Sequence, residues 1–174
     1  MKLHLGCSKK KIYGFTNVDI RPEVEPDLME DSTTLKSIKR ETVDLIYASH
    51  ILEHTKDPLT VLVRWREILK PGGELYVAVP DMGACILHYI QHKDLNIIHS
   101  FIWGGAKNDY DFHYTGFDEK RLADCLFRAG FRSIKKYDWR QTDWAYIDDY
   151  SQAYLPHLDK INGVLLSLNM VATK

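Results

Sequence analysis

The sequence predicts a Rossmann-like, doubly wound α/β fold with a mostly parallel sheet and a C-terminal antiparallel pair of strands. Short apolar runs bounded by turn residues alternate with amphipathic helical patterns, which is typical of parallel sheets. Two more strand-like runs follow the last helical pattern, which favours a late pair joined by a long connection. With 174 residues, 45% of them hydrophobic and 27% charged, we expect a single domain over residues 1–174.

The first half of the chain contains four runs that we expect to form buried strands. They are KLHLG at 2–6, FTNVDI at 15–20, VDLIYAS at 43–49 and GELYVAVP at 73–80, with PDLME at 26–30 as a further short candidate. Only a short segment separates the first two runs, whereas a parallel crossover usually needs a dozen or more residues. We therefore predict that the first crossover helix is shortened or absent.

Two segments carry clear helical signals. DPLTVLVRWREILKPGG at 57–73 has Asp57 as an N-cap and Pro58 as first helical residue, and Gly72 with Gly73 is the expected stop. FDEKRLADCLFRAGF at 117–131 has an apolar face and ends at Gly130. The strand-like runs that follow are FRSIKKYDW at 131–139 and SLNMVATK at 167–174.

Charge and composition exclude several classes of protein. A formal net charge of -1 provides no basic surface for a phosphate backbone, so we expect no nucleic-acid partner. No apolar run approaches the roughly 20 residues of a membrane span. Three scattered cysteines match no metal or disulfide spacing and indicate reduced thiols. We expect a soluble, cytoplasmic protein without a membrane partner.

Five motifs in order carry a resemblance to a known family. They are LHLGC, the acid in NVDI, MEDS, DLIYASHILEH and LKPGGELYVAVPD. Together they resemble class I S-adenosylmethionine-dependent methyltransferases, in particular small bacterial ones associated with polysaccharide biosynthesis, which share a GFxNVDI strand, an HxTGF segment and a SLNxxA final strand. The resemblance implies methyl transfer from S-adenosylmethionine to an oxygen or nitrogen of a small molecule or saccharide precursor.

The resemblance places the cofactor at the ends of the first two strands. Gly6 lets the backbone approach the methionine portion, while Cys7 and Ser8 contribute mainly backbone groups. Asp19 is placed to accept both ribose hydroxyls through its two oxygens, and Ile20 belongs to the same set. Ser8 stands where such enzymes usually have another glycine. A cofactor without phosphate depends less on a helix N-terminus, so a trimmed crossover is compatible with binding.

The resemblance also assigns residues after the third and fourth strands. Asp31 would accept from the adenine amino group, and the Ser32 N–H would contact the adenine ring. Ala48, Ser49 and His50 would flank the cofactor. The alternative for each acid is a solvated loop carboxylate or a helix cap.

A dinucleotide site does not fit the first loop. The dehydrogenase fingerprint needs glycines two and five residues after the first, followed by a helix, but Ser8 and Lys11 stand there. We therefore exclude NAD as the cofactor.

The segment HILEH raises the question of a metal. His50, Glu53 and His54 match H-x-x-E-H, the zinc motif of inverzincin peptidases. The segment directly follows a buried strand, where it matches the methyltransferase pattern, so we expect no metal and keep a zinc hydrolase as a remote alternative.

Two histidines are candidate general bases for the methyl acceptor. His54 follows a strand end assigned to the cofactor, and a structural role is favoured there. His113 lies in the segment between the fifth strand and the late helix, where this fold builds its acceptor site. We favour His113 as the catalytic group, with His54 as the alternative.

Aromatic residues are dense between Phe101 and Tyr154. They indicate packing of a small insertion, a homodimer surface, or an acceptor pocket that stacks on a sugar or another ring. A non-catalytic cofactor-binding scaffold on the same fold is the main functional alternative, because the first crossover is short.

Overall fold

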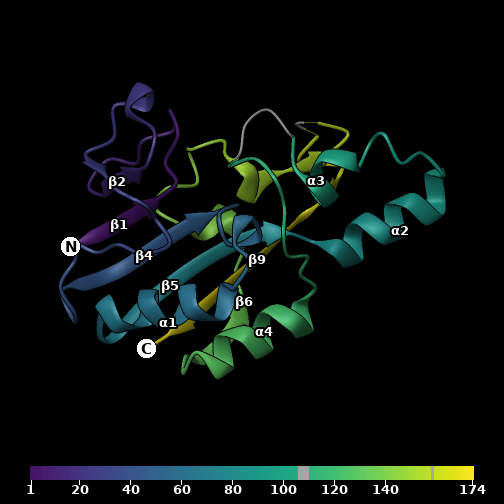
Figure 1. Ribbon diagram of the computed structural model, residues 1–174. Helices are drawn as coiled ribbons and strands as arrows, with labels where there is room; N and C mark the ends of the chain where they lie inside the picture. The colour runs from purple at the N-terminus through teal and green to yellow at the C-terminus, as the bar shows by residue number, and fades with distance from the viewer. Residues whose placement is uncertain (106–109, 158) are drawn as a thin grey trace.

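The computed structural model describes residues 1–105, 110–157 and 159–174, and its main feature is a twisted sheet (Figure 1). Within these residues the sheet has seven strands in the order β3-β2-β1-β4-β5-β9-β6. Their bounds are β1 Lys2–Leu5, β2 Thr16–Asp19, β3 Leu28–Met29, β4 Val43–Ser49, β5 Leu69–Pro80, β6 Arg132–Lys136 and β9 Ser167–Thr173. The first five strands are parallel, and β9 runs antiparallel to both β5 and β6. The predicted fold class and the late strand pair are confirmed.

The two predicted helices pack together on one face of the sheet (Figure 1). They are α1, Pro58–Ile68, and α4, Glu119–Arg128. The Asp57 side chain accepts from the backbone N–H of Thr60 at 3.2 Å, which confirms the predicted N-cap of α1. Their apolar faces and the inner face of the sheet form the main core, with Trp65 as its largest fully buried side chain.

The predicted end of α1 at Gly72 and Gly73 is wrong. The helix ends at Ile68, and Leu69 is already extended and pairs with Val43. The glycines belong to β5, where the Lys174 N–H donates to the Gly73 carbonyl at 2.9 Å. A register shift between Val43 and Leu45 accommodates this turn-rich start of the strand.

No helix joins β1 to β2 in the described chain, as predicted. The buried Asn17 side chain organises the connection instead: its oxygen accepts from the Ile12 N–H at 2.8 Å, and its nitrogen contacts the carbonyls of Ile12 and Phe15 at 3.3 Å. The backbone groups that a crossover helix would satisfy internally are therefore satisfied by one side chain of the following strand.

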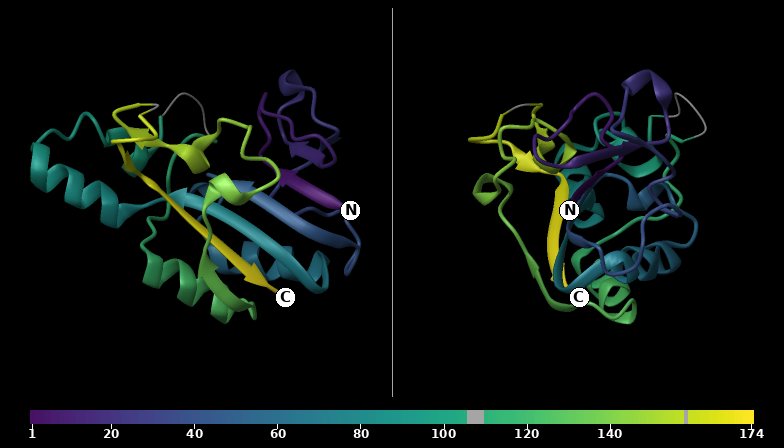
Figure 2. Two further views of the ribbon diagram at one scale, coloured as in Figure 1. Left: turned by 180° about the vertical axis from the view of Figure 1, so that it is seen from behind. Right: turned by 90° about the vertical axis from the view of Figure 1, so that its left-hand side faces the viewer.

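The sheet face opposite α1 and α4 is covered by the connection that follows β6 (Figure 2). The buried Trp144 packs against Tyr47 and Tyr76 of the sheet and against Phe15, with ring centroids 5.0, 5.2 and 5.4 Å apart. Asp149 also accepts from the Tyr47 hydroxyl at 2.6 Å. Part of the aromatic segment thus takes the place of a covering helix.

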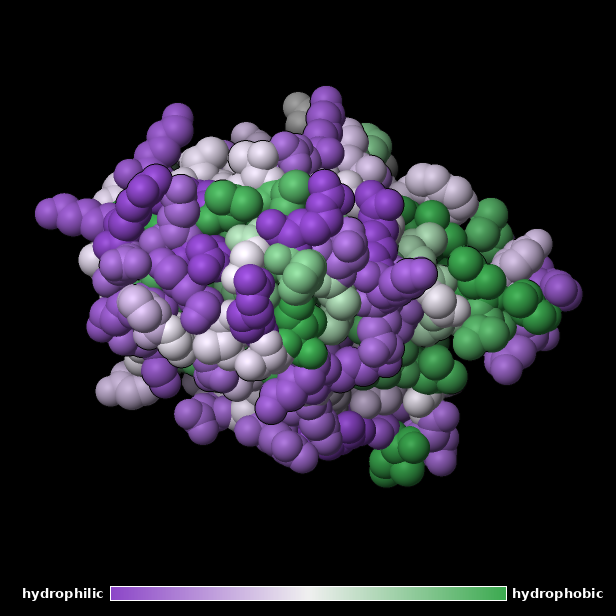
Figure 3. Space-filling model, turned by 90° about the horizontal axis from the view of Figure 1, so that it is seen from below, coloured by the Kyte–Doolittle hydropathy of each residue, from purple (hydrophilic) through white to green (hydrophobic). Residues whose placement is uncertain are grey.

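Several other elements were not predicted. They are α2 Met82–His92, α3 His99–Trp103, the hairpin of β7 Tyr154–Leu155 and β8 Val164–Leu165, and the 3-10 helices η1 Pro22–Val24, η2 Leu52–His54, η3 Trp139–Gln141 and η4 Tyr150–Gln152. α2 projects from the body of the molecule and exposes Ile86, Leu87 and Ile90, where apolar atoms gather in Figure 3. In the part of the chain that the structure describes, no helix has the length and apolar character to cross a membrane.

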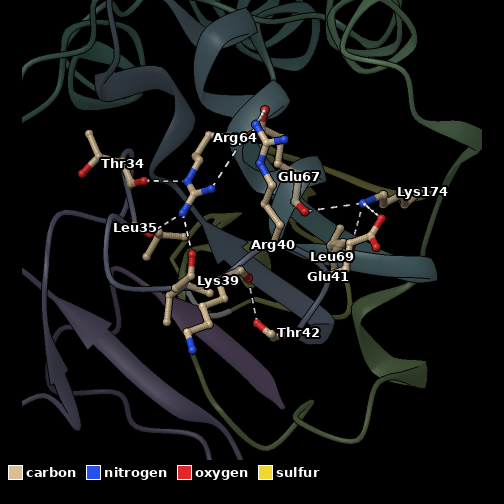
Figure 4. A network of polar contacts seen from close by, with 11 residues as sticks. Thr34, Leu35, Lys39, Arg40, Glu41, Thr42, Arg64, Glu67, Leu69 and Lys174 are labelled. Atoms are coloured by element: carbon tan, nitrogen blue, oxygen red, sulfur yellow. Dashed lines mark hydrogen bonds and ion pairs between the residues drawn. The ribbon is translucent and has the colours of Figure 1, made fainter.

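A polar network fixes the loop that follows β3 (Figure 4). The Arg64 guanidinium on α1 donates to the carbonyls of Thr34, Leu35 and Ile38 at 2.9, 2.6 and 2.7 Å. The Trp65 indole N–H donates to the Ser32 carbonyl at 2.8 Å. The segment that begins with Asp31 and Ser32 is therefore anchored to the body of the protein.

Candidate active site

The ends of three neighbouring parallel strands meet at one edge of the sheet. Gly6 follows β1, Asp19 ends β2 and Ser49 ends β4, so the residues lie at the point where the strand order reverses. A cavity of about 1150 Å³ opens there. Ligand pockets are usually about 300–1,000 Å³, so this cavity has room for a cofactor and a small second molecule.

The loop after β1 has an unusual backbone. Gly6 has φ +62°, a conformation that favours glycine, and a Cβ at this position would also lie 1.9 Å from Ile51 Cδ1 and would displace the end of that side chain. Ser8 also has positive φ, at 48°, which explains why a second glycine would suit this position. The Gly6 N–H donates to the Ser32 hydroxyl at 3.2 Å and the Ser8 N–H to Asp19 at 2.9 Å.

Asp19 is buried and accepts four hydrogen bonds. Besides the Ser8 N–H, it receives the backbone N–H of Arg21 at 3.0 Å and two guanidinium contacts from Arg21, Nε at 3.0 Å and Nη2 at 3.1 Å. Burial alone would raise the pKa of Asp19, but the hydrogen bonds and charge of Arg21 outweigh burial and lower it. The predicted ribose acceptor is thus ionised and is held by a guanidinium that also lines the cavity.

Asp31 and Ser32 line the same cavity and also shape their loop. One oxygen of Asp31 accepts from the Thr33 N–H and hydroxyl at 2.8 and 2.7 Å, as in an N-cap. The cap alternative is therefore observed for Asp31, and its contact with adenine stays a prediction that its second oxygen, not used in that turn, could serve.

The three residues predicted after β4 have different environments. Ser49 lines the cavity, and its buried hydroxyl has no hydrogen-bond partner among the described residues. His50 lines it as well, with φ 53°, its Nε2 3.1 Å from the Ser167 hydroxyl and its ring against Tyr150. Ala48 is fully buried in the main core and is not a lining residue, because alternate strand residues point to opposite faces. The side chain of Ala48 therefore faces away from the cavity, whereas Cys7 and Ile20 line it.

Glu53 lies at the floor of the cavity, with only 1% of its surface exposed. Neither carboxyl oxygen has a hydrogen-bond partner among the described residues, although His50 Nδ1 lies 3.3 Å from Oε1. Burial raises the pKa of Glu53 to about 8. Burial, followed by repulsion from His113 and His54, lowers the pKa of His50 to about 3. Burial therefore disfavours the charged form of both groups and works against a salt bridge between Glu53 and His50.

His54 and His113, the two candidate bases, lie together at the cavity. Their ring centroids are 4.8 Å apart, so the expectation that they occupy different parts of the site was wrong. His54 Nδ1 lies 3.0 Å from the Phe112 carbonyl and His113 Nδ1 lies 3.0 Å from the Phe101 carbonyl. Burial lowers the pKa of both rings, which favours the neutral form.

Backbone contacts bring His113 next to η2. The Glu53 carbonyl accepts from the N–H groups of Tyr114 and Thr115 at 2.8 and 3.2 Å, and the Thr115 hydroxyl donates to the Thr55 carbonyl at 3.0 Å. The His113 N–H donates to the Trp103 carbonyl at 3.2 Å. The sequence pattern did not identify Arg21 or Glu53 as functional candidates; the only signal for Glu53 was its place in HILEH.

The fold and the strand-end acid together define a class of protein. An open parallel sheet with a cavity at its switch point and an ionised carboxylate ending the second strand suits a cofactor that contains a ribose. The cavity volume and the unpartnered Ser49 hydroxyl fit a polar nucleoside-containing molecule. The guanidinium of Arg21 occupies Asp19 and would compete with the ribose of such a cofactor.

Comparison with known proteins gives the family. A model of the methyltransferase domain family matches residues 7–136, so the chain belongs to that family. The fold is that of class I S-adenosylmethionine-dependent methyltransferases, so the family match indicates S-adenosylmethionine as the cofactor.

Solved structures show the same fold at low identity. A methyltransferase from Methanosarcina mazei has a TM-score of 0.62 and 18% identity over 99% of this chain and 91% of its own. A Thermotoga maritima structure described as a possible histamine N-methyltransferase has a TM-score of 0.61 and 15% identity, covering 99% and 81%. The 1,6-didemethyltoxoflavin-N1-methyltransferase from Burkholderia thailandensis, bound to S-adenosylhomocysteine, has a TM-score of 0.57 and 16% identity, covering 99% and 70%.

A curated relative matches only part of the chain. It is a highly reducing polyketide synthase from Alternaria alternata that is 25% identical in an alignment of 100 positions, and the match covers 49% of this chain and 4% of that protein. The chain therefore spans a very small part of this relative's length.

Proposed function

We propose that the protein transfers a methyl group to an oxygen or nitrogen of a small polar molecule, with a saccharide precursor for polysaccharide biosynthesis as the acceptor class. One observation carries the proposal. The strand-end residues Gly6 and Asp19 and the histidines His54 and His113 line a single cavity. A cofactor at the strand ends would therefore share its space with groups able to take up a proton.

S-adenosylmethionine supplies a methyl carbon on a sulfonium for in-line displacement. Most of the rate enhancement then comes from holding the acceptor atom in line with that carbon. A carbonyl oxygen only accepts hydrogen bonds, so Nδ1 of His113 carries the hydrogen that bonds to Phe101. Its Nε2 then carries the lone pair. His113 can therefore take up the proton that the methyl acceptor loses.

Polar and aromatic residues beyond the histidines suit a polyhydroxylated or ring-shaped acceptor. Tyr150 lines the cavity with 66% of its surface exposed, and Ser100 and Asp148 line it as well. An exposed aromatic ring beside hydroxyl and carboxylate groups matches the alternating apolar and polar faces of a sugar.

We also propose a cytoplasmic location and a homodimer, without a membrane or nucleic-acid partner. The apolar residues exposed on α2 support an association of two copies. Sedimentation velocity would test the dimer, and a single monomeric species at micromolar concentration would contradict it.

The function is tested first at the cofactor. Asp19→Ala deletes the acceptor for both ribose hydroxyls, and hydrogen bonds to a charged group contribute about 1.5–3 kcal/mol each. We expect at least a tenfold loss of S-adenosylhomocysteine affinity by isothermal titration calorimetry. Asp44→Ala, which changes an exposed acid outside the cavity, is the matched control.

The acceptor is then sought by screening sugars and nucleotide sugars for methyl transfer. A wild-type protein that fails to bind the cofactor would overturn the proposal. Binding without methylation of any acceptor would favour the scaffold alternative, which the occupied Asp19 carboxylate supports.

A further inference from the structure

The feature that the proposed function leaves unexplained is a cluster of three potential ligands at one end of the cavity. Glu53, His54 and His113 each offer one ligand atom, and these atoms lie within 4.8 Å of one another. All three residues line the cavity. We propose that Glu53, His54 and His113 bind a divalent first-row transition-metal ion beside the methyl acceptor.

The first argument is the orientation of the two imidazoles. Both Nδ1 atoms contact backbone carbonyls at 3.0 Å, which fixes the hydrogen on Nδ1 and leaves a lone pair on each Nε2. Metal-binding histidines almost always donate their second ring N–H to such a partner, which fixes the tautomer and orients the ring. His54 and His113 therefore already have the outer hydrogen bonds of metal ligands.

The second argument is the carboxyl group of Glu53. Both oxygens are buried without a hydrogen-bond partner in the described chain, which is a costly arrangement for a polar side chain. His113 Nε2 lies 4.0 Å from Glu53 Oε1. A bound cation would provide the missing partner for the oxygens and for both lone pairs at once.

The distances need only a small adjustment. Ligand atoms about 2.0–2.1 Å from a tetrahedral ion are about 3.4 Å apart, so ligand atoms that lie up to 4.8 Å apart must approach by at most about 1.4 Å. Rotation of the side chains about their χ angles provides such a change without moving the backbone. The backbone bonds from Tyr114 and Thr115 to the Glu53 carbonyl keep the two segments in register.

The ligand types select the class of ion. Two imidazole nitrogens and one carboxylate suit Zn²⁺, Fe²⁺ or Co²⁺, whereas Mg²⁺ and Ca²⁺ prefer oxygen ligands. Three protein ligands leave a coordination position open, as in catalytic rather than structural sites. Resting on the proposed function, such an ion would put a positive charge beside the acceptor atom, whose proton would pass to water in the open cavity. With the ion bound, His54 and His113 act as ligands, and the base role proposed for His113 applies to the site without the ion.

This set differs from the H-x-x-E-H pair considered from the sequence. His50 is the histidine that a peptidase would need, but its Nε2 contacts Ser167 and its ring packs against Tyr150. The third ligand comes instead from His113, which follows η2 (Leu52–His54) by about a third of the length of the chain. The structure thus favours a metal site where the sequence pattern argued against one.

Metal titration tests the proposal directly. The chelator-treated protein is titrated with Zn²⁺ by calorimetry and with Co²⁺ by visible absorption, and we expect one ion per chain. His113→Ala and Glu53→Gln should each weaken binding at least tenfold, since each removes a ligand. Glu53→Gln keeps the size of the side chain, so it remains informative if His113→Ala does not fold. Mg²⁺ at millimolar concentration should not compete.

The control is a second pair of neighbouring histidines outside the cavity. His88 and His92 on α2 have ring centroids 4.2 Å apart, and His88→Ala should leave the titration unchanged. Four outcomes would each overturn the proposal. They are loss of metal binding in His88→Ala, retained metal binding in both ligand variants, competition by Mg²⁺, and no metal binding to the wild type. A separate titration with S-adenosylhomocysteine tests the proposed function, so failure of the metal site and failure of the cofactor site are distinguishable.

Discussion

The Arg21 side chain should weaken cofactor binding, so Arg21→Ala should tighten it. Asp19 already receives four hydrogen bonds, and two of them come from the Arg21 guanidinium. A ribose can reach the carboxylate only if that guanidinium moves away. The backbone N–H groups of Ser8 and Arg21 keep their contacts, so the competition concerns the side chain alone.

The size of the expected change in cofactor affinity follows from the solvent exposure of the Arg21–Asp19 ion pair. The Arg21 side chain is 35% exposed while that of Asp19 is 4% exposed, so the upper part of the range for exposed ion pairs applies, about 1 kcal/mol. Removal of this competition should lower the dissociation constant of S-adenosylhomocysteine about fivefold. The same change should make the ligand-free protein less stable, because Asp19 loses its partner.

Isothermal titration calorimetry of three proteins measures the effect. Arg21→Ala is compared with the wild type and with Arg40→Ala, which removes an exposed arginine bonded to Glu67 at 2.8 Å, outside the cavity. Arg40→Ala should leave the affinity unchanged. A weaker affinity of Arg21→Ala would refute the reasoning, because it would mean that the guanidinium binds the cofactor itself.

Two further predictions concern stability. Trp144→Ala should lower the free energy of unfolding by about 3–5 kcal/mol in urea, because the buried indole covers the sheet where a crossover helix is missing. Trp103→Ala removes an indole that is 47% exposed and should cost less; equal losses would contradict a covering role for Trp144. The second prediction uses pH: the folded pKa of Asp19 is lowered, so its stabilising contribution is present above the ordinary value of about 3.9 and is lost as pH falls through the lower folded pKa. Urea unfolding at pH 7, 5, 4 and 3 should therefore show a difference between wild type and Asp19→Asn that is constant from pH 7 to 5 and shrinks below about pH 4; a difference that persists at pH 3 would argue against this linkage.

The sequence was sufficient for the parallel part of the sheet because each strand is a short apolar run with clear boundaries. The N-cap of α1 and the missing first crossover were also visible, since capping and connection length are local properties. The end of α1 was not, because the glycines at its expected stop enter β5 through long-range bonds to Lys174. α2 escaped prediction because much of its apolar surface is exposed and follows no core-facing pattern.

The sequence predicted the candidate site residues that lie at strand ends. It did not predict the residues that only tertiary contacts bring together. Gly6, Asp19 and Ser49 follow directly from the strand pattern. The pairing of His54 with His113 depends on backbone bonds between η2 and the segment before α4, which no local signal encodes. The burial of Glu53 and the contact of Arg21 with Asp19 are likewise consequences of the folded state.

The sheet is covered by a segment near the end of the chain, and this affects how the chain folds. The family match ends at residue 136, whereas Trp144 and β9 come later. A fragment limited to the shared segment would leave Ile12 and Tyr47 without the indole that packs with them, and would leave β5 without its partner β9. During synthesis the N-terminal strands can complete their packing only after the last part of the chain has been made. Folding therefore depends on contacts between distant residues, which predicts slow folding. We therefore expect a fragment of residues 7–136 to be less stable than the whole chain.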